Sequence, residues 1–332
     1  MATIYEVSKL AGVSLATVSR VVNNSAKVRE STRVKVEAAM KELGFRPNAI
    51  ARSLATNRTD TVGIVISELD GPFYGPMMTN IEAKFRAANI HAIFTAGHSN
   101  EESEKNAIQF LLARRVDALI LHVESVSDSY LEQVEKEGVP IVVIGRQVDS
   151  ETVASVDLDN ELGGYLAAKA VIAAGHREIA YISGPSWKVD ASQRLAGHRR
   201  ALVEAGLPWK EQDLYEGDYL APSGYECAAK ALTQNPNYRA IVCANDEMAS
   251  GVLLKLREQG ISVPQDVSVV GFDDVTHAKY LYPALTTIDH PIGEMASYAA
   301  NWVLSSCYGH HSVGHMSLVK PSLVERESLA KI

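Results

Sequence analysis

From Thr61 almost to its end, the chain alternates short apolar runs with longer amphipathic segments such as 101–115 and 160–175. The apolar runs are 61–67, 91–97, 117–123, 140–145, 178–184, 240–246 and 267–274. Apolar strands that alternate with helices are typical of parallel sheets covered by helices on both faces. Seven or more such units in about 270 residues favour two open sheets. A closed barrel of eight units is the alternative.

The first 60 residues differ from the rest of the chain in charge. They contain ten Lys or Arg and five Asp or Glu, a net charge of +5, whereas the whole chain carries −8, which leaves −13 for the remainder. A basic head on an acidic protein favours contact of the head with a polyanion. A basic segment that only faces solvent is the alternative reading.

Residues 3–24 have the pattern of two short helices joined by a tight turn. Thr3 is expected to begin the first helix and Gly12 to end it, and Ser14 is expected to cap the second. The side chains expected to face inward are Ile4, Val7 and Leu10 in the first helix and Val18, Val21 and Val22 in the second. Two short helices joined by a turn that contains glycine predict a helix-turn-helix.

A third helix is expected within residues 28–45. Ser31 or Thr32 is its expected cap, and Gly44 its end. Its expected inward side chains are Val34, Ala38 and Leu43.

The second helix has an outward face that its core does not require. This face consists of Leu15, Ala16, Ser19 and Arg20. An arginine can donate two hydrogen bonds to guanine O6 and N7, and small apolar side chains can approach a thymine methyl group. We therefore predict a base-reading surface, with a structural three-helix bundle as the alternative. The other expected DNA contacts of the head are Thr3, Ser14, Thr17 and Asn23.

A short linker with its own helical signal follows the head. Pro47 ends the preceding helix, and Asn48 can cap a helix over 49–55. About seven residues are too few for a stable isolated helix, so this one is expected to form only when it is supported. Leu54 is a candidate wedge for a minor-groove base step, although packing on the next domain is its stronger reading when it is taken alone. The expected DNA contacts here are Asn48, Ala51, Arg52 and Leu54.

The chain lacks the usual signatures of an enzyme or a cofactor site. No GxGxxG follows a strand, and neither a Walker loop nor a GxSxG elbow is present. The cysteines, Cys227, Cys243 and Cys307, are far apart and odd in number, which argues against a disulfide framework or a zinc site. We expect no catalytic residue and no cofactor. The absence of a signal peptide or membrane span in the sequence predicts a cytoplasmic protein with no membrane partner.

One histidine-rich segment near the C-terminus resembles a metal site at first sight. His311 and His315 would share a face if the segment were helical, but Gly309 and Gly314 disfavour a helix and His310 would point elsewhere. We predict a polar surface turn and no bound metal.

Polar and aromatic residues follow the predicted strands, where ligands bind in open α/β sheets. They are Asp70 to Tyr74, Gly97, His98, Gly145, Arg146, Trp187, Asn245, Asp246, Asp273 and Asp274. Carboxylate, amide, guanidinium and aromatic groups together suit a polyhydroxylated ligand, whereas an anion site would have more cations. For Asp246 a helix cap is the favoured reading, and for Asp274 a turn residue is the alternative.

Four segments resemble the lactose/galactose-repressor family of bacterial transcription regulators. They are 2–24 (ATIYEVSKLAGVSLATVSRVVNN), 44–54 (GFRPNAIARSL), 267–274 (VSVVGFDD) and 285–289 (LTTID), and the resemblance covers nearly the whole chain. It implies that the second helix lies in the major groove and that the linker becomes a hinge helix in the minor groove. Leu54 would then open the central base step of a palindromic operator.

The resemblance also implies the domain organisation. We expect an all-α helix-turn-helix headpiece over 1–46, a hinge helix and linker over 47–60, and an effector-binding α/β core over 61–332. The core would have two lobes, as in periplasmic binding proteins. The N-lobe is placed at about 61–159 and 290–320 and the C-lobe at about 160–289 and 321–332. No leucine heptad follows residues 324–332, so a homodimer is expected.

By the same resemblance, Arg194, Asn245 and Asp273 fall on effector-contacting positions, and Phe73, Tyr74 and Tyr219 on aromatic ones. A structural ion pair is the alternative for Arg194, but a cleft-facing arginine without a counterpart is costly, which favours a ligand. With Asp70, Arg146 and Trp187, these residues form the predicted effector site. The chain departs from the lactose repressor at Gly145–Arg146, in place of an aspartate, and at Ile292, in place of an aromatic residue.

The segments 119–131, 174–184 and 194–207 look closer to regulators of galactose or β-glucoside use. We therefore expect a repressor of sugar-utilisation genes controlled by a mono- or disaccharide. A nucleoside or purine, a sugar phosphate, and a co-repressor type of response are the alternatives. A sugar-binding transport protein and a DNA-organising protein without a ligand are the other classes considered. The first should carry an export signal and no basic head, and the second should not need a cleft lined with aromatic and acidic residues.

Overall fold

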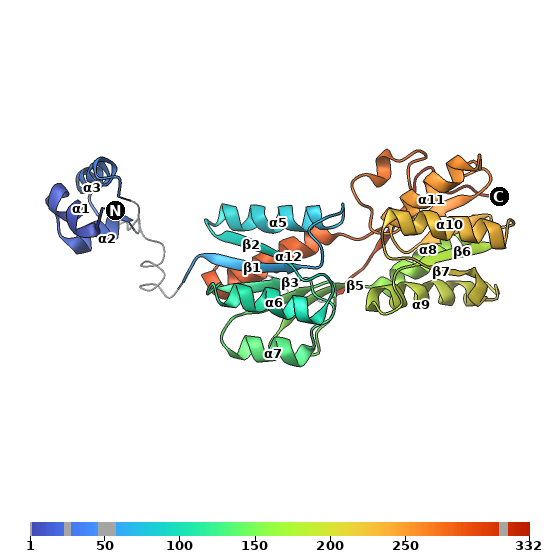
Figure 1. Ribbon diagram of the computed structural model, residues 1–332, viewed down its shortest axis with the longest axis horizontal. Helices are drawn as coiled ribbons and strands as arrows, with labels where there is room; N and C mark the ends of the chain where they lie inside the picture. Colours follow the sequence, from blue (N-terminus) through green and yellow to red (C-terminus); the bar gives the residue numbers. More distant parts are fainter. Residues whose placement is uncertain (1, 23–27, 46–57, 312–317) are drawn as a thin grey trace. The chain divides into compact units, whose positions relative to one another are not determined.

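The computed structural model describes residues 2–22, 28–45, 58–311 and 318–332. Two compact units divide the chain at Asp60, namely Met1–Asp60 and Thr61–Ile332 (Figure 1). Helices α1 to α3 belong to the first unit, and the strands belong to the second. No helix of the described ranges combines the length and the apolar character needed to span a membrane.

The first unit contains α1 (Ile4–Ala11), α2 (Leu15–Val22) and α3 (Glu30–Glu42). Thr3 begins α1 with a capping box, because its hydroxyl accepts the Glu6 N–H while its own backbone N–H donates to the Glu6 carboxylate at 2.7 Å. Gly12 ends this helix with a left-handed φ of +64°. The predicted beginning and end of α1 are confirmed.

The core of the first unit is small and valine-rich. Its buried residues are Val7, Val18, Val21, Val36 and Ala39, with Met40 and Leu43 packed against them. Val36, Ala39 and Met40 of α3, with Leu43 directly after it, recur at the spacing of one helix face.

Some expectations for the first unit were wrong. Val34 and Leu10 are 54% and 47% exposed, and Ala38 is exposed as well. The apolar residues of α3 fit two overlapping stripes, and the stripe that begins at Val36 is the one that meets α1 and α2. The expected cap of α3 also fails, because Arg29 precedes its first turn without a side-chain hydrogen bond.

The second unit contains two parallel sheets, as predicted. The first sheet has the strand order β11-β5-β4-β3-β1-β2. Its strands are β1 (Thr61–Ile66), β2 (His91–Ala96), β3 (Ala118–Leu121), β4 (Ile141–Ile144), β5 (Ala154–Leu158) and β11 (Leu318–Val319). Its helices are α5 (Tyr74–Ala87), α6 (Glu101–Leu112), α7 (Asp128–Lys136) and α12 (Ile292–Tyr308). Helices α5 and α12 pack on one face and α6 and α7 on the other (Figure 1).

The second sheet has the order β7-β6-β8-β9. Its strands are β6 (Ile179–Ser183), β7 (Leu214–Glu216), β8 (Ala240–Cys243) and β9 (Ser268–Val270). Its helices are α8 (Asn160–Ala173), α9 (Val189–Glu204), α10 (Ala221–Gln234) and α11 (Asp246–Glu258), with single 3-10 turns at Glu211–Asp213 and Ala278–Tyr280. An antiparallel pair, β10 (Thr287–Asp289) and β12 (Ser322–Val324), packs beside them.

Each sheet with its helices forms one lobe of the second unit. Within the described residues the chain passes between the lobes three times, after β5, between β10 and α12, and between β11 and β12. The carboxyl ends of the strands in both lobes face these passages, so residues that follow the strands meet between the lobes.

Helices α8 and α9 approach each other closely through two glycines. A Cβ atom at Gly164 would lie 1.9 Å from the carbonyl oxygen of Arg194, and one at Gly197 would lie 1.8 Å from that of Glu161. Both contacts are with backbone, which cannot move aside as a flexible side chain could. The two glycines therefore fix the position of α9, the helix that carries Arg194.

Candidate functional site

The face of α2 opposite its valines is open to solvent. Ala16 and Arg20 are exposed, and Leu15 and Ser19 are half-buried. Val18 faces the core and is fully buried. The α2 surface therefore presents one long cation among small side chains, the combination expected of a helix that reads base edges in a major groove.

Three other residues predicted to contact DNA have local structural partners. Ser14 caps α2, since its hydroxyl accepts the backbone N–H of Thr17 at 3.2 Å and lies 2.9 Å from the Thr17 hydroxyl. Thr3 performs the capping of α1. Asn23, Asn48, Ala51, Arg52 and Leu54 lie outside the described residues, so their DNA contacts stay predictions.

Between the two lobes of the second unit, a buried arginine is held from several directions. Arg194 on α9 donates from Nε to Asn160 Oδ1 at 2.9 Å and from Nη1 to the carbonyl of Ala244 at 2.6 Å. Its guanidinium lies 3.8 Å from the centroid of the Phe272 ring. These contacts orient the guanidinium before any ligand binds.

Two carboxylates lie beside Arg194. Asp190 Oδ2 is 3.7 Å from Nη2, and Asp273 Oδ1 is 3.6 Å from Nη1. Burial raises the pKa of Asp190, but Arg194 and the Tyr219 hydroxyl, which donates to Asp190 at 2.8 Å, outweigh it and hold that pKa below its usual value. Asp190 is therefore ionised at neutral pH.

Asn245 and Asp273 differ in how much of their bonding capacity is already used. Asn245 caps α11 by accepting the N–H of Met248 at 2.9 Å and donates to the carbonyl of Tyr219 at 2.9 Å. Asp273 is 8% exposed, and its Oδ1 has no hydrogen-bond partner among the described residues. Asp273 thus offers a buried acceptor that a ligand could use.

The facing lobe contributes a group of rings. The centroid of the Phe73 ring lies 5.2 Å from that of Tyr74 and 4.9 Å from that of His290, and Tyr74 lies 5.5 Å from His122. Both ring nitrogens of His290 lack a hydrogen-bond partner among the described residues, although Nδ1 is 3.5 Å from Asp273 Oδ1. These rings form an apolar group with polar edges between the two lobes.

His122 occupies space that Gly145 leaves free. A Cβ atom at Gly145 would lie 2.9 Å from His122 Nε2, and Ser67 Oγ lies 3.0 Å from His122 Nδ1. Burial lowers the pKa of His122, so the ring is neutral at pH 7. The absence of a side chain at Gly145 thus leaves room for the His122 ring.

An ion pair connects the lobes next to these groups. Lys188 Nζ lies 2.8 Å and 2.7 Å from the two carboxylate oxygens of Glu124 and 3.4 Å from Ser99 Oγ. Lys188 directly precedes α9, whereas Glu124 and Ser99 belong to the first lobe. The Lys188–Glu124 ion pair therefore joins the two lobes beside the start of α9.

We call the group between the lobes the interlobe cluster, which consists of Phe73, Tyr74, His122, Asp190, Arg194, Tyr219, Asn245, Asp273 and His290. Six of these residues were predicted from the sequence. Two further predicted residues lie apart from it. Asp70 is exposed and accepts its neighbour Gly71's N–H at 2.7 Å, and Trp187 is 58% exposed.

Arg146 has a structural role instead of the predicted ligand contact. Its guanidinium donates to the carbonyls of Val123 and Val126 at 3.1 Å and 2.9 Å and to Asp128 at 2.5 Å. These bonds tie the end of β4 to the start of α7. The structure does not support the predicted ligand contact of Arg146, because its guanidinium donates to a loop and to Asp128 of α7, all within the first lobe.

Asp246 does not cap α11, since Asn245 does. Asp246 is fully buried and accepts from Thr287 Oγ1 at 2.6 Å and from the Val275 N–H at 3.0 Å. Burial and the nearby Asp273 raise its pKa well above the usual value. Asp274 has a left-handed φ of +49° and pairs with Arg326 at 2.6 Å, which fits its reading as a turn residue.

Three members of the interlobe cluster were missed by the sequence reasoning. His122 directly follows β3, so the strand-end rule could have selected it. Asp190 precedes Arg194 by four residues on one helix face, which is a signal for pairing. His290 follows β10, a strand that the sequence pattern did not reveal.

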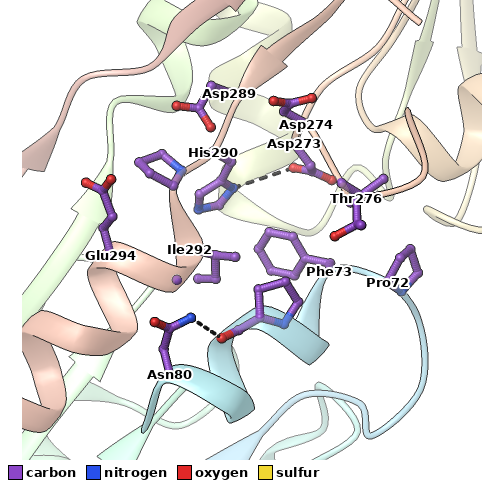
Figure 2. Close-up of a pocket in the computed structure, with 14 residues that line it drawn as sticks. Pro72, Phe73, Asn80, Asp273, Asp274, Thr276, Asp289, His290, Ile292 and Glu294 are labelled. Atoms are coloured by element: carbon purple, nitrogen blue, oxygen red, sulfur yellow. Dashed lines mark hydrogen bonds and ion pairs between the residues drawn. The ribbon is translucent and has the colours of Figure 1, made fainter. Parts of the chain in front are cut away.

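A cavity of about 320 Å³ adjoins the interlobe cluster where the chain passes from β10 to α12 (Figure 2). We call it the hinge pocket. Its lining residues come from the segments 72–80, 273–276 and 289–294, and Phe73, Asp273 and His290 belong both to it and to the cluster.

The hinge pocket is lined by more acidic side chains than basic ones. Burial and the neighbours Asp274 and Glu294 raise the pKa of Asp289. Burial, Asp273 and Asp70 raise the pKa of Glu247 in the same way. Burial is the larger cause of both shifts, and the neighbouring carboxylates add to it; these carboxylates oppose the binding of an anion nearby.

Comparisons with known proteins agree with this architecture. The family model of bacterial regulatory proteins, lacI family, matches residues 3–48, and that of a periplasmic binding protein-like domain matches 168–329. The HTH-type transcriptional regulator GalR of Escherichia coli K12 is 36% identical over 330 residues, which cover 99% of this chain and 96% of that protein. The HTH-type transcriptional repressor PurR of Erwinia tasmaniensis is 35% identical over 332 residues, with coverage of 99% and 97%.

Two solved structures extend the comparison to three dimensions. The Lac repressor dimer bound to operator and the anti-inducer ONPF has a TM-score of 0.87 and 32% identity, with 99% of each chain covered. A CelR–cellobiose complex has a TM-score of 0.72 and 32% identity, with 99% of this chain and 100% of that chain covered.

Proposed function

Because the chain belongs to the lacI family of bacterial regulatory proteins and is thus a DNA-binding transcriptional regulator, we propose that a small carbohydrate between its lobes controls its hold on an operator. In this proposal the protein is a repressor of sugar-utilisation genes. It acts as a homodimer whose two heads read an inverted repeat, in the cytoplasm where the DNA lies.

The observation that carries the proposal is the bonding capacity of the interlobe cluster. Arg194 is a preoriented donor, Asp273 is a buried acceptor, and His290 can do either. Each sugar hydroxyl both donates and accepts, and the apolar face of a sugar ring packs on aromatic side chains. The rings of Phe73 and Tyr74 supply such a wall.

The charge of the hinge pocket and the identity of the relatives help to rank the alternative ligand classes, a sugar phosphate and a purine. The carboxyl groups of Asp273, Asp274, Asp289 and Glu294 line the hinge pocket, so a sugar phosphate would be repelled there. A purine is the second candidate, because the relatives include PurR and a flat base could stack on the same rings. Carbohydrates and purines should therefore both be tested for binding.

Asp273→Asn should remove the response to the effector. The wild-type unfolding temperature is expected to rise by about 5 °C or more at a saturating carbohydrate concentration, since ligand at 100 times its Kd adds about 2.7 kcal/mol. The variant should show less than a fifth of that rise, because the neutral amide accepts more weakly than the carboxylate and cannot pair as an anion with Arg194. Thermal melts of the full chain with a panel of sugars and purine bases measure both. Asp149→Asn, at an exposed carboxylate, is the matched control. A full rise in Asp273→Asn would remove this residue from the site.

Arg20→Ala should weaken the reading of one base pair in each half-site. The expected cost is about 1–3 kcal/mol on the preferred operator and much less on DNA substituted at that base pair. Fluorescence anisotropy with a set of singly substituted duplexes measures the difference. Lys41→Ala on α3 removes an equal charge outside the α2 face and should leave base preference unchanged. Equal weakening of Arg20→Ala on every duplex would assign it to phosphate contact only.

The coupling free energy required between the effector site and the DNA-binding head is modest. Allosteric coupling is typically about 1–3 kcal/mol, and specific DNA binding exceeds non-specific binding by about 4–10 kcal/mol. A movement of the lobes that changes the support of the linker helix would be enough to release an operator. Tighter operator binding with the sugar would instead make the response that of a co-repressor.

A further inference from the structure

We propose that a second cavity, formed within the second lobe by α8 and the C-terminal segment, binds a small anion with an apolar body, of the class of a medium-chain carboxylate. This cavity measures about 380 Å³, and its lining residues come from the segments 166–174 and 323–331 and from Thr286. We call it the C-terminal pocket. It shares no lining residue with the hinge pocket or the interlobe cluster, so its ligand would be distinct from the proposed carbohydrate.

The C-terminal segment forms a fixed wall of this pocket. The backbone N–H of Ile332 donates to the carbonyl of Ala174, directly after α8, at 2.8 Å. The backbone N–H of Arg326 donates to Thr286 Oγ1 at 2.9 Å. These bonds hold both ends of the segment against the rest of the lobe, so the pocket exists before any ligand binds, as small-molecule sites usually do.

The floor of the C-terminal pocket is apolar. Leu166, Leu323 and Leu329 line it, and all three are half-buried and pack against the core of the second lobe. Ala170 and Ala173 of α8 also line it, and their small side chains leave space between α8 and the C-terminal segment. An apolar chain or ring can therefore be removed from water there.

Two uncompensated lysines stand beside this floor. Lys169 and Lys331 line the pocket and are exposed, and neither forms an ion pair with a carboxylate among the described residues. The third cation of the lining, Arg326, already pairs with Asp274 at 2.6 Å. Glu325 is the one acidic side chain in the described lining. The free charge of the pocket is therefore positive, whereas the whole chain carries −8.

The end of α8 does not offer its usual set of free carbonyl oxygens, which would repel an anion. Several of them accept backbone N–H groups of later residues: His176 donates to Val171 at 3.1 Å, Gly175 to Ile172 at 3.0 Å and Ile332 to Ala174 at 2.8 Å. These three carbonyls are therefore not available as acceptors that would compete with the lysine donors.

The combination of floor and lysines selects the chemistry of the ligand. An ammonium group attracts a carboxylate, and the aliphatic stem of a lysine can cover an apolar body next to it. A sugar phosphate fits poorly, because its hydroxyls would lose their hydrogen bonds to water on a floor of leucines and alanines. The volume of about 380 Å³ lies at the lower end of the range for small-molecule sites, about 300–1,000 Å³. A single medium-chain carboxylate is therefore the expected occupant.

Isothermal titration of the full chain with octanoate tests this site. We expect one saturable site per chain, with octan-1-ol and acetate at least tenfold weaker, because one lacks the charge and the other the apolar body. The double variant Lys169→Glu, Lys331→Glu should bind octanoate at least tenfold more weakly. Lys210→Glu with Lys230→Glu makes the same charge change at two exposed lysines outside the pocket and should alter the affinity by less than twofold.

A second variant tests the floor. Ala173→Trp places a bulky ring at an exposed position of α8 that lines the pocket, and it should weaken octanoate binding at least tenfold. Thr233→Trp, at an exposed position of α10 outside the pocket, should keep the wild-type affinity.

Several results would overturn the assignment of the C-terminal pocket. Octan-1-ol that binds as tightly as octanoate would exclude a role of the lysines, and acetate that does so would exclude a role of the floor. Unchanged octanoate affinity in the double lysine variant would place the ligand elsewhere. If octanoate shows no saturable binding and the double variant sediments in a lower association state, the surface is a contact between copies of the chain. The carbohydrate proposal is untouched by these results, since it is tested with sugars and with Asp273→Asn.

Discussion

Replacing Arg194 with methionine is expected to lower the free energy of unfolding of the Thr61–Ile332 unit by about 3–5 kcal/mol, the usual result of breaking a buried ion pair from one side. The substitution leaves Asp190 and Asp273 without their cation and removes the donors to Asn160 and Ala244. It should also abolish carbohydrate binding, because the preoriented donor of the interlobe cluster is lost.

The loss of unfolding free energy in Arg194→Met should depend on pH in a defined direction. In the wild type, Arg194 keeps the pKa of Asp190 below its usual value, so this group adds stability at neutral pH that is lost as the pH falls through that lowered pKa. In the variant that contribution is missing at every pH. The difference between the two proteins should therefore be largest near pH 7 and become smaller in acid.

Urea unfolding followed by tryptophan fluorescence measures this effect. All three tryptophans, Trp187, Trp209 and Trp302, lie in the second unit, so the signal reports that unit. Arg200→Met is the matched control, since Arg200 lies on the same helix and pairs with Glu161, but its side chain is 45% exposed. It should cost less than about 1 kcal/mol. Equal losses in the two variants would show that Arg194 is not the organising charge of the cluster.

The sequence predicts the fold well where a strand is apolar over its whole length. Strands β1, β3, β4 and β8 are buried on both faces and appear as continuous apolar runs. β5 was not predicted, because Ser155 and Asp157 interrupt it. β10 and β12 have three residues each and owe their conformation to each other, a pairing that local patterns do not contain.

The site was predictable only in part, for a related reason. The strand-end rule and the family resemblance both selected Asn245 and Asp273, the resemblance alone selected Arg194, and the geometry brings the three together. The resemblance gave no position for His290, and the strand-end rule could not, because the strand before it was not apparent. Arg146 follows β4 as a cleft residue would, but the carbonyls that accept its hydrogen bonds come from a separate loop, and no local pattern shows which way a long side chain turns.

Gly164→Ala should have the second large effect, although it adds a single methyl group. The new Cβ atom would lie 1.9 Å from the carbonyl oxygen of Arg194, so α8 and α9 would have to separate. We expect a loss of about 3 kcal/mol or more in the free energy of unfolding, at the upper end of the usual cost of overpacking. Carbohydrate affinity should fall at least tenfold in the folded fraction, because the backbone that is displaced is that of Arg194.

Gly75→Ala makes the same chemical change in α5, where a Cβ atom would have no neighbour within 4 Å. That variant should be neutral or more stable by about 0.5–1 kcal/mol, because alanine favours a helix over glycine. Urea unfolding and sugar titration of the two variants side by side separate helix propensity from close packing. If Gly164→Ala stays within 1 kcal/mol of the wild type and keeps its sugar affinity, the glycine contact does not position Arg194. The rigid donor on which the carbohydrate proposal depends would then need another support, and Asn160 and Phe272 are the groups in contact with the guanidinium that could provide it.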